Sequence, residues 1–233
     1  MINKKSIFRK NRWDHFLLKG NKVIIRSLRR DDIDKRLAWK KYPDPLYFHY
    51  NPPNFGQKER EKWYFKRKYD PHMIYLSIDN YQDQLVGFIS LYKIDRQVKT
   101  AWMGLFLGYE FTDKGYGTDA ILTLAKYFFE EIKFEKMFLD VASHNKRAIR
   151  CYLKCGFKFI RTKYNKHDPR TNIDIFGDER YKDIRKYFKI EGDEVLVQFD
   201  DMVLTKDSYE CASRTLRDEH THMWLARKSA LTS

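Results

Sequence analysis

Apolar residues change their spacing within residues 98–160, and the change predicts a strand, a loop and a helix in succession. The run from Ala101 to Leu107 is almost continuously apolar and is typical of a buried strand. Beyond Gly117, apolar residues recur at the spacing of one helix face, at Ala120, Ile121, Leu124, Ala125 and Phe128. A glycine-containing loop therefore connects the strand to the start of a helix.

The loop that opens this helix has the features of an anion-binding site. Gly115 and Gly117 have no Cβ, so backbone N–H groups can approach a ligand closely there. The first N–H groups of a helix lack partners, and the positive end of the helix dipole lies beside them. The loop therefore suits a phosphate or pyrophosphate, and the alternative is that its glycines form a plain turn.

The same loop also fits the G-x-G-x-x-G/A pattern of dinucleotide-binding folds, from Gly115 to Ala120. Asp140 lies near the position of the ribose-binding acid in those folds. Their glycines, however, follow the first strand of the domain almost at once. Here Tyr109 to Lys114 intervene, and a long stretch of chain comes first. The context therefore favours a different phosphate-binding fold.

A second strand and helix follow. Met137 to Val141 is apolar, Asn145 is a good helix N-cap, and Gly156 suits the left-handed residue that ends a helix. The run from Asn145 to Phe157 resembles the last helix of the GNAT superfamily of N-acetyltransferases, whose pattern is N-x-x-A-I-x-x-Y-x-K-x-G-F. The segment 112–117 resembles that family's pyrophosphate motif, Q/R-x-x-G-x-G/A, with Thr112 in place of the usual Arg or Gln.

The resemblance is strong over 98–160 and fainter over 22–97 and 194–205. Within the family, the layout is similar to that of the enzymes that acetylate ribosomal-protein N-termini. The fold class it implies is α/β (α+β), with a mixed, mainly antiparallel central sheet flanked by helices. The domain would span 22–205, after a basic arm at 1–21 that either packs on the domain or stays loose.

Two further segments fall outside the family pattern. The polar stretch 163–193 is predicted to be an insertion before the last strand, Val195 to Leu204, with a helix at 179–188. The residues 206–233 are predicted to form a C-terminal extension that begins with a helix. The insertion carries Ile184, Tyr187 and Phe188, which could supply a homodimer interface.

The N-terminal half is predicted to contain a strand at 23–28, a helix from Asp31 or Asp32 to Trp39, a helix at 57–68 and a hairpin of 73–79 and 84–94. Prolines break the chain between the two helices into an aromatic loop. In the family this region covers the acceptor site, and simple packing is the alternative. The lone His49 in this loop is predicted to be structural.

The resemblance implies acetyl-CoA as the acyl donor and an amine as the acceptor, without a metal. The pantetheine arm would pair with the exposed edge of the strand before the loop. The pyrophosphate would bind the loop, and two helix residues would complete the coenzyme site. The implied coenzyme-binding residues are Leu105, Phe106, Leu107, Thr112, Asp113, Lys114, Gly115, Tyr116, Gly117, Thr118, Asn145 and Lys154.

Two residues are candidates for proton transfer. By resemblance, Tyr152 would be the general acid that protonates the departing sulfur. Family members often carry Glu early in the strand before the loop, where this chain has Trp102, which could instead form an aromatic wall. Asp140 is our candidate for the general base, acting directly or through water.

Composition narrows the setting and leaves the acceptor open. The 233 residues are 42% hydrophobic, the formal charge is +14, and three sparse cysteines indicate reduced thiols and a cytoplasmic protein. No apolar run is long enough for a membrane span. A basic surface slightly favours a ribosomal or other protein N-terminus over a polyamine or antibiotic amine, whereas an acidic cleft would reverse that preference. A non-catalytic acyl-CoA-binding module and a basic nucleic-acid-binding protein are the alternatives.

Overall fold

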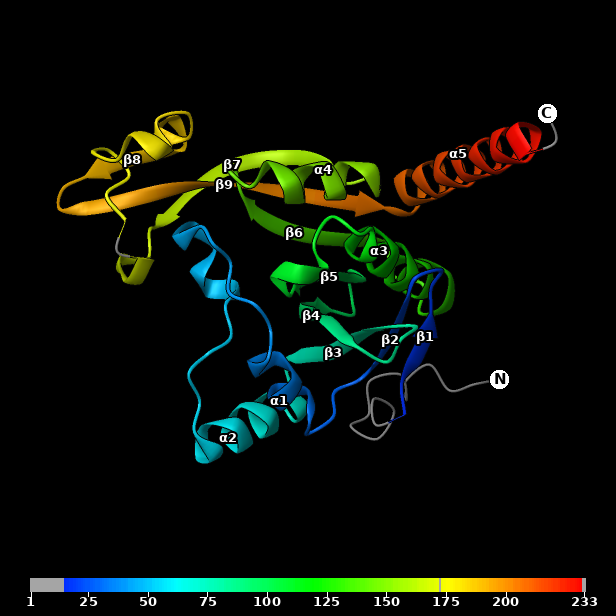
Figure 1. Cartoon of the computed structure of the whole chain (residues 1–233), viewed down its shortest axis with the longest axis horizontal. Helices are drawn as coiled ribbons and strands as arrows, with labels where there is room; N and C mark the ends of the chain where they lie inside the picture. The colour runs from blue at the N-terminus through cyan, green and yellow to red at the C-terminus, as the bar shows by residue number, and fades with distance from the viewer. Residues whose placement is uncertain (1–14, 172, 232–233) are drawn as a thin grey trace.

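One nine-stranded sheet organises the computed structural model, which describes residues 15–171 and 173–231 (Figure 1). The strand order is β1-β2-β3-β4-β5-β6-β9-β7, and β8 pairs with β9 outside this path. Every pairing is antiparallel except that of β5 with β6. The predicted mixed, mainly antiparallel sheet is therefore confirmed. The strands are β1 (Leu17–Lys19), β2 (Val23–Ser27), β3 (Met73–Asn80), β4 (Leu85–Asp95), β5 (Thr100–Leu107), β6 (Lys136–Ala142), β7 (Lys158–Lys166), β8 (Phe188–Glu191) and β9 (Glu194–Thr205).

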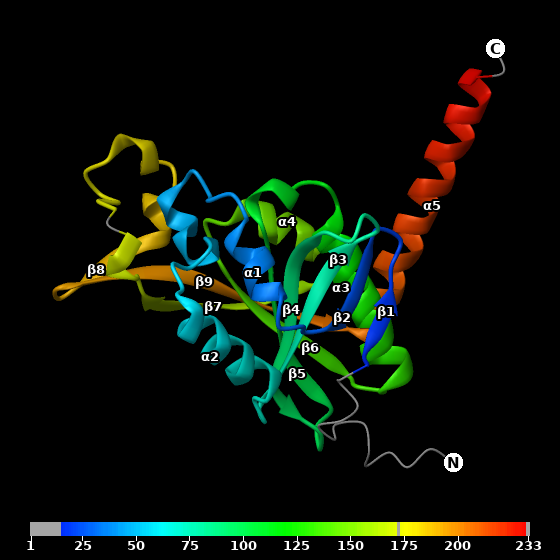
Figure 2. The same cartoon turned by 60° about the horizontal axis from the view of Figure 1, so that its bottom comes forward.

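Alternate residues of the central strands enter two hydrophobic clusters, because successive side chains of a strand point to opposite faces. On β4, Ile89 packs in the larger cluster with helix α3, whereas Phe88 packs in the smaller cluster with Trp39 and Trp63. Helices therefore flank both faces of the sheet (Figures 1 and 2). They are α1 (Asp32–Leu37) and α2 (Gln57–Lys68) on one face, and α3 (Tyr116–Lys126) and α4 (Lys146–Lys154) on the other.

The parallel strands β5 and β6 pair only at their beginnings. Their ladder joins residues 100–102 to residues 136–138 and then stops, although β5 continues to Leu107 and β6 to Ala142. From Met103 to Leu107, β5 is hydrogen-bonded to β4 on one side, and its other edge has no ladder to β6. The divergence opens the sheet at the end where α3 and α4 begin.

The predicted helix at 179–188 is wrong. The structure has short 3-10 turns at Glu179–Tyr181 and Arg185–Tyr187, followed by β8. Tyr181, Ile184 and Tyr187 recur every third residue, which matches the period of a 3-10 helix better than that of an α-helix. These side chains, with Phe188, pack within the chain in a third cluster around Leu46. The residues named as a possible homodimer interface therefore pack inside their own chain.

The ends of the predicted domain also differ from expectation. Phe16 is buried and β1 pairs with β2, so the arm is packed on the sheet from residue 15 onward, while the rest of it lies outside the described residues. Strand β7 runs through Lys166, and the stretch outside its ladder with β9 begins at residue 167. The predicted C-terminal helix is α5 (Lys206–Leu231), which extends to the last described residue and projects from the sheet in both views (Figures 1 and 2).

Candidate active site

A cavity of about 630 Å³ lies where β5 and β6 diverge. One side of its lining comes from the end of β5, the glycine loop and the start of α4. The other side comes from the segment after α1, the end of β6 and the insertion. Residues of the first group include Leu105, Phe106, Leu107, Thr112, Asp113, Gly115, Gly117, Thr118 and Asn145, and residues of the second include Tyr42, Tyr47, His49, Tyr50, Asp140, His144, His167 and Asp168.

The first side of the cavity, to which the family resemblance assigns the coenzyme, combines a strand edge with the glycine loop. Gly115 has a φ of +82°, the left-handed conformation that glycine adopts without strain, and it begins α3 as its N-cap. A Cβ at Gly117 would lie 3.6–3.7 Å from its nearest neighbours, including Cys151 Sγ, which is ordinary contact. The edge of β5 offers backbone groups beside these glycines, although the Tyr42 hydroxyl donates to the Leu107 carbonyl at 3.0 Å. An extended coenzyme with amides and phosphates fits this cradle.

A lysine outside the predicted set lies at the same loop. Lys22 Nζ donates to the carbonyl of Lys114 at 3.2 Å and would lie 3.0 Å from a Cβ at Gly115. The turn that carries Lys22 is fixed by Asp119, whose carboxylate accepts three backbone N–H groups, from Asn21, Lys22 and Val23. A cation therefore stands beside the loop in which Thr112 replaces the family's Arg or Gln.

Three residues of the predicted coenzyme set do not line the cavity. The Lys114 side chain is exposed, and Tyr116 turns toward Asn80, whose amide donates to its hydroxyl at 3.4 Å. Lys154 is exposed near the far end of α4. Only the main chain of the first two can reach a ligand in the cavity, and a role for Lys154 stays a prediction.

Asn145 and Tyr152 both face the cavity from α4. Asn145 is buried, and its side-chain oxygen caps the helix by accepting from the Ala148 amide at 3.2 Å, so the predicted N-cap is confirmed. Its side-chain NH₂ group is not used by this cap. Tyr152 is 8% exposed, and burial raises the pKa of its hydroxyl far above the ordinary value, with Tyr50, the two cysteines of α4 and Asp140 adding to the effect. The phenol is therefore protonated at neutral pH.

Asp140 lines the cavity but is held in an ion-pair network. Lys163 Nζ lies 3.0 Å from Asp140 Oδ2 and 2.7 Å from Asp201 Oδ1. Burial opposes the charge of Lys163, but hydrogen bonds with the two carboxylates outweigh it and raise the lysine pKa. The lysine also lies 5.3 Å from the ring centroid of Trp102, which stacks on Phe138 outside the cavity lining. This ion pair uses Oδ2 of Asp140 and does not involve its Oδ1.

Aromatic rings crowd the second side of the cavity, which the family resemblance assigns to the acceptor and which we call the acceptor side. Tyr42, Tyr47 and Tyr50 have ring centroids 5.7–6.3 Å apart, and all three line the cavity. The guanidinium of Arg147, from the first turn of α4, lies 5.5 Å from the Tyr42 centroid and 5.8 Å from the Tyr47 centroid. The aromatic loop is therefore part of the cavity wall.

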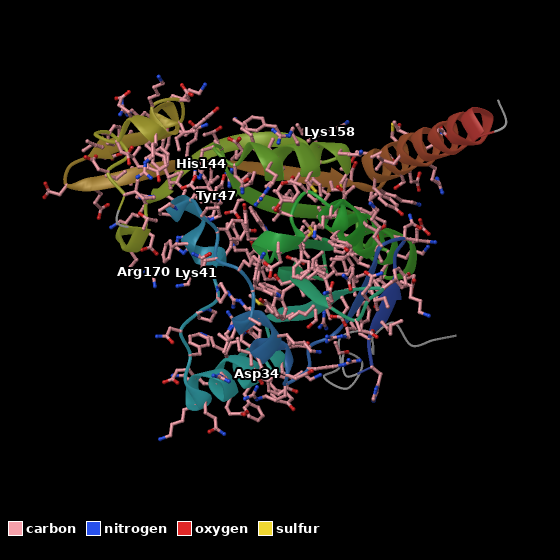
Figure 3. All side chains as sticks on the ribbon, in the orientation of Figure 1. Asp34, Lys41, Tyr47, His144, Lys158 and Arg170 are labelled. Atoms are coloured by element: carbon pink, nitrogen blue, oxygen red, sulfur yellow. The ribbon has the colours of Figure 1, made fainter. Side chains whose placement is uncertain are left out.

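Three histidines meet at the outer end of this side. The His144 ring stacks on Phe188 at 5.5 Å and lies 6.3 Å from Tyr47, and Figure 3 shows His144 and Tyr47 together beside the end of β6. Its Nδ1 is buried without a hydrogen-bond partner among the described residues. Burial lowers the pKa of His144 to about 4 and also lowers the pKa values of His49 and His167. The three imidazoles are uncharged at neutral pH.

Most of the site residues that the sequence did not predict were missed for one reason. His167 lines the cavity, Lys22 contacts the glycine loop and Lys163 contacts Asp140, each from a segment distant in sequence from both motifs, and no local pattern marks them. Arg147 could have been singled out, because it lies inside the motif of the last helix, two residues after Asn145.

The diverging strands, the edge of β5 and the glycine loop form a gap in the sheet that suits an extended, phosphate-bearing ligand. Residues 22–158 match the family model described as the acetyltransferase (GNAT) domain, and the chain belongs to this family. It is an N-acetyltransferase that uses acetyl-CoA as its donor, and the predicted class of enzyme is confirmed.

Known proteins similar to the chain carry related names. It is 21% identical over 173 residues to a spermidine N(1)-acetyltransferase of Vibrio cholerae, covering 74% of this chain and 95% of that protein. It is 26% identical over 170 residues to the probable N-acetyltransferase YjcK of Bacillus subtilis, and the match covers 69% of this chain and 91% of that protein.

Solved structures support the fold. A spermidine N-acetyltransferase of Vibrio cholerae in complex with CoA and spermine superposes with a TM-score of 0.56 at 20% identity, over 80% of this chain and 97% of that one. A second chain from the same organism, provisionally assigned as a ribosomal-protein-serine acetyltransferase, gives a TM-score of 0.61 at 15% identity, over 82% and 98%. At these identities the likeness concerns the fold alone.

The described residues include neither a membrane-spanning helix nor a metal-binding cluster. No helix among them has the length and apolar character needed to cross a membrane. No group of three or more His, Cys, Asp or Glu side chains in the described part of the chain could hold a metal ion.

Proposed function

We propose that the protein transfers the acetyl group of acetyl-CoA to a primary amine, on a protein N-terminus or a small molecule, by direct attack of the amine on the thioester. The observation that carries this proposal is the edge of β5 beyond Trp102, which has no ladder to β6 and lines the cavity together with the glycine loop and Tyr152. The edge would hold the pantetheine amides, and the loop would hold the pyrophosphate. The thioester would then end beside the side chains of β6 and α4, where the amine enters.

The chain's own residues would provide each proton-transfer and positioning step. The nitrogen forms a bond to the acetyl carbon, the carbon–sulfur bond breaks, and a backbone N–H of β5 stabilises the charge on the carbonyl oxygen meanwhile. Asp140 would accept the proton that the nitrogen loses, directly or through water. Tyr152 would donate its proton to the departing sulfur, and Asn145 would orient the coenzyme arm.

The acceptor is proposed only as a class. Spermidine comes from the names of relatives, and a ribosomal-protein N-terminus comes from the likeness of the layout. We also propose a cytoplasmic location, supported by three free cysteines, two of which lie one helical turn apart on α4. A homodimer stays a prediction, which light scattering can test. The insertion residues named as its possible interface pack inside the chain.

Release of free CoA in the presence of an amine panel tests the proposal. The panel should contain spermidine, an aminoglycoside and short peptides with free or acetylated N-termini. Turnover that needs the free amine, together with the acetylated product in mass spectra, is expected. Binding of acetyl-CoA without turnover of any amine would instead favour the non-catalytic acyl-CoA-binding module.

A further inference from the structure

The carboxylates on the acceptor side of the cavity already have cationic partners. Asp140 is ion-paired with Lys163, and Asp168 Oδ2 lies 2.5 Å from the Arg170 guanidinium. The remaining carboxylate among the described lining residues, that of Asp113, belongs to the coenzyme loop. A polycationic acceptor gains most from carboxylates that are not already neutralised. The acceptor side therefore offers little to a polyamine.

Arg147 has the opposite character. Its partners are the faces of Tyr42 and Tyr47, and no carboxylate among the described residues lies within ion-pair distance. The guanidinium also hydrogen-bonds with the side chain of Tyr42, and its remaining N–H donors are available for a carboxylate. The half-buried guanidinium has lost part of its hydration, which a bound anion would compensate.

The position of Arg147 relative to the proposed reaction centre is also defined. Tyr50 lies 5.8 Å from Tyr42 and 6.3 Å from Tyr47, the two rings beneath the guanidinium. Burial raises the pKa of Tyr50 to about 12; the neighbouring tyrosines and Asp140 add to the effect, and Arg147 opposes it. Tyr50 is thus within electrostatic reach of both Asp140 and Arg147. The Arg147 guanidinium therefore lines the same cavity as the groups proposed to handle the amine.

No other unpaired cation competes with Arg147 on the described acceptor side. The three histidines are neutral because burial lowers their pKa values. Lys166 is paired with Glu194, and Lys163 is shared by Asp140 and Asp201. The net effect is a cavity with an aromatic wall and one available positive charge.

We propose, resting on the acetyl transfer proposed above, that the acceptor carries a carboxylate close to its reacting amine and that Arg147 binds this carboxylate. The substrate class is then amino acids or the N-termini of acidic peptides, and polyamines are excluded. Arg147 acts as a specificity-determining residue that holds the acceptor while the amine faces Asp140 and Tyr152.

Three amidated tripeptides of equal length test this assignment: Ser-Glu-Glu, Ser-Gln-Gln and Ser-Lys-Lys, with spermidine as the polycation. The wild-type enzyme should acetylate the acidic peptide at least about tenfold more efficiently, in kcat/KM, than the basic one. Arg147→Gln should remove about ten- to a hundredfold of kcat/KM for the acidic peptide, mainly through KM, because a charge-assisted bidentate pair is lost. It should change the value for the neutral peptide by less than about threefold.

The matched control is Arg150→Gln, which removes an exposed arginine one turn further along α4. In this variant, kcat/KM for every peptide and the dissociation constant of acetyl-CoA should stay unchanged. A weaker acetyl-CoA affinity in Arg147→Gln would mean that the guanidinium binds a coenzyme phosphate, which overturns the assignment. A wild-type preference for spermidine or the basic peptide would overturn it equally.

The failure of this assignment is distinguishable from failure of the acetyl transfer itself. If no amine is acetylated, the proposed function fails, and calorimetric binding of the same peptides to the CoA-bound protein still tests Arg147. Tighter binding of the acidic peptide, lost in Arg147→Gln but kept in Arg150→Gln, is the expected result. Equal binding of the acidic and basic peptides would refute the carboxylate site.

Discussion

Tyr152 is the side chain in which burial and proposed chemistry meet most directly. Its ring contacts Phe157 in the core, while its hydroxyl end lines the cavity near Tyr50 and Asp140. Burial keeps the phenol protonated, so it is a hydrogen-bond donor at every pH at which the enzyme is expected to work. A thiolate that forms beside it receives a donor that is already in place.

Replacing Tyr152 with Phe removes this donor and keeps the packing. We expect kcat to fall by about a hundredfold or more, since proton transfer by a positioned side chain contributes about 10²–10⁴. The acetyl-CoA dissociation constant and the unfolding midpoint should change little, which separates a catalytic role from a structural one. Steady-state kinetics with a saturating amine measure the effect, and an unchanged kcat would remove Tyr152 from the mechanism.

His144 predicts a pH dependence of stability. The folded-state pKa of His144 is lowered to about 4, mainly by burial. The nearby His167 and Lys146 also lower this pKa, and Asp44 opposes them. An unfolded histidine titrates near 6.5. Between these values the unfolded chain binds the extra proton. The contribution to the free energy of unfolding is therefore complete above pH 6.5 and is lost as the pH falls toward 4, by at most about 3 kcal/mol.

Urea unfolding at pH 7 and pH 5 measures this linkage in the wild type and in His144→Gln. The variant lacks the titrating group, so its free energy of unfolding should decline less between the two pH values. His49 and His167, whose pKa values are also lowered by burial, contribute with the same sign in both proteins. Identical declines would show that His144 is not buried as a neutral ring.

At the scale of elements, the site is a product of the strand–loop–helix unit around β5 and α3. The strand ends at Leu107, the loop turns at Gly115, and α3 packs its apolar face under the sheet. The ladder between β5 and β6 stops early, so the loop and the strand edge face one cavity. The coenzyme site therefore depends on the conformation of the loop more than on particular side chains.

The two glycines of the loop predict a contrast. Gly115→Ala places a Cβ in a left-handed residue and against Lys22, so it should cost about 1 kcal/mol of stability and weaken acetyl-CoA binding. Gly117→Ala meets only ordinary contacts in a helical position, so the fold should be kept. Unfolding midpoints and acetyl-CoA titrations of both variants check this, and equal losses would contradict the loop geometry.

The sequence predicted those parts of the fold that depend on neighbouring residues. The strand before the loop, the helix after Gly117 and the cap at Asn145 each depend on neighbouring residues and are found as predicted. Lys163 and His167 were missed as site residues because contacts with β9 place them: Lys163 pairs with Phe199 and reaches Asp140, and the His167 N–H donates to the Val195 carbonyl just beyond β7. The helix at 179–188 failed because three-residue spacing and pairing of Phe188 with Val197 outweighed helical propensity.

At the scale of the whole molecule, the sheet is continuous on both sides of the gap between β5 and β6. Strands β1 to β5 form one half, and β6, β9 and β7 form the other, joined by three residue pairs at the base of the gap. The insertion contacts the segment after α1 through the cluster around Leu46 and bridges the two halves at the acceptor side. A ligand bound in the gap contacts both halves and should stabilise the entire fold.

This arrangement predicts a large and selective thermal shift. A ligand at a hundred times its dissociation constant adds about 2.7 kcal/mol to the free energy of unfolding, which for a chain of this size raises Tm by about 5–10 °C. Acetyl-CoA and CoA should both produce the shift, whereas NADH, NADPH and a short RNA at the same concentration should not. The Gly115→Ala variant is the internal control, because its response should be displaced to higher coenzyme concentration. A shift with a nicotinamide coenzyme alone would mean that the loop from Gly115 to Ala120 binds a dinucleotide, and a response to RNA alone would mean that the +14 charge serves nucleic-acid binding.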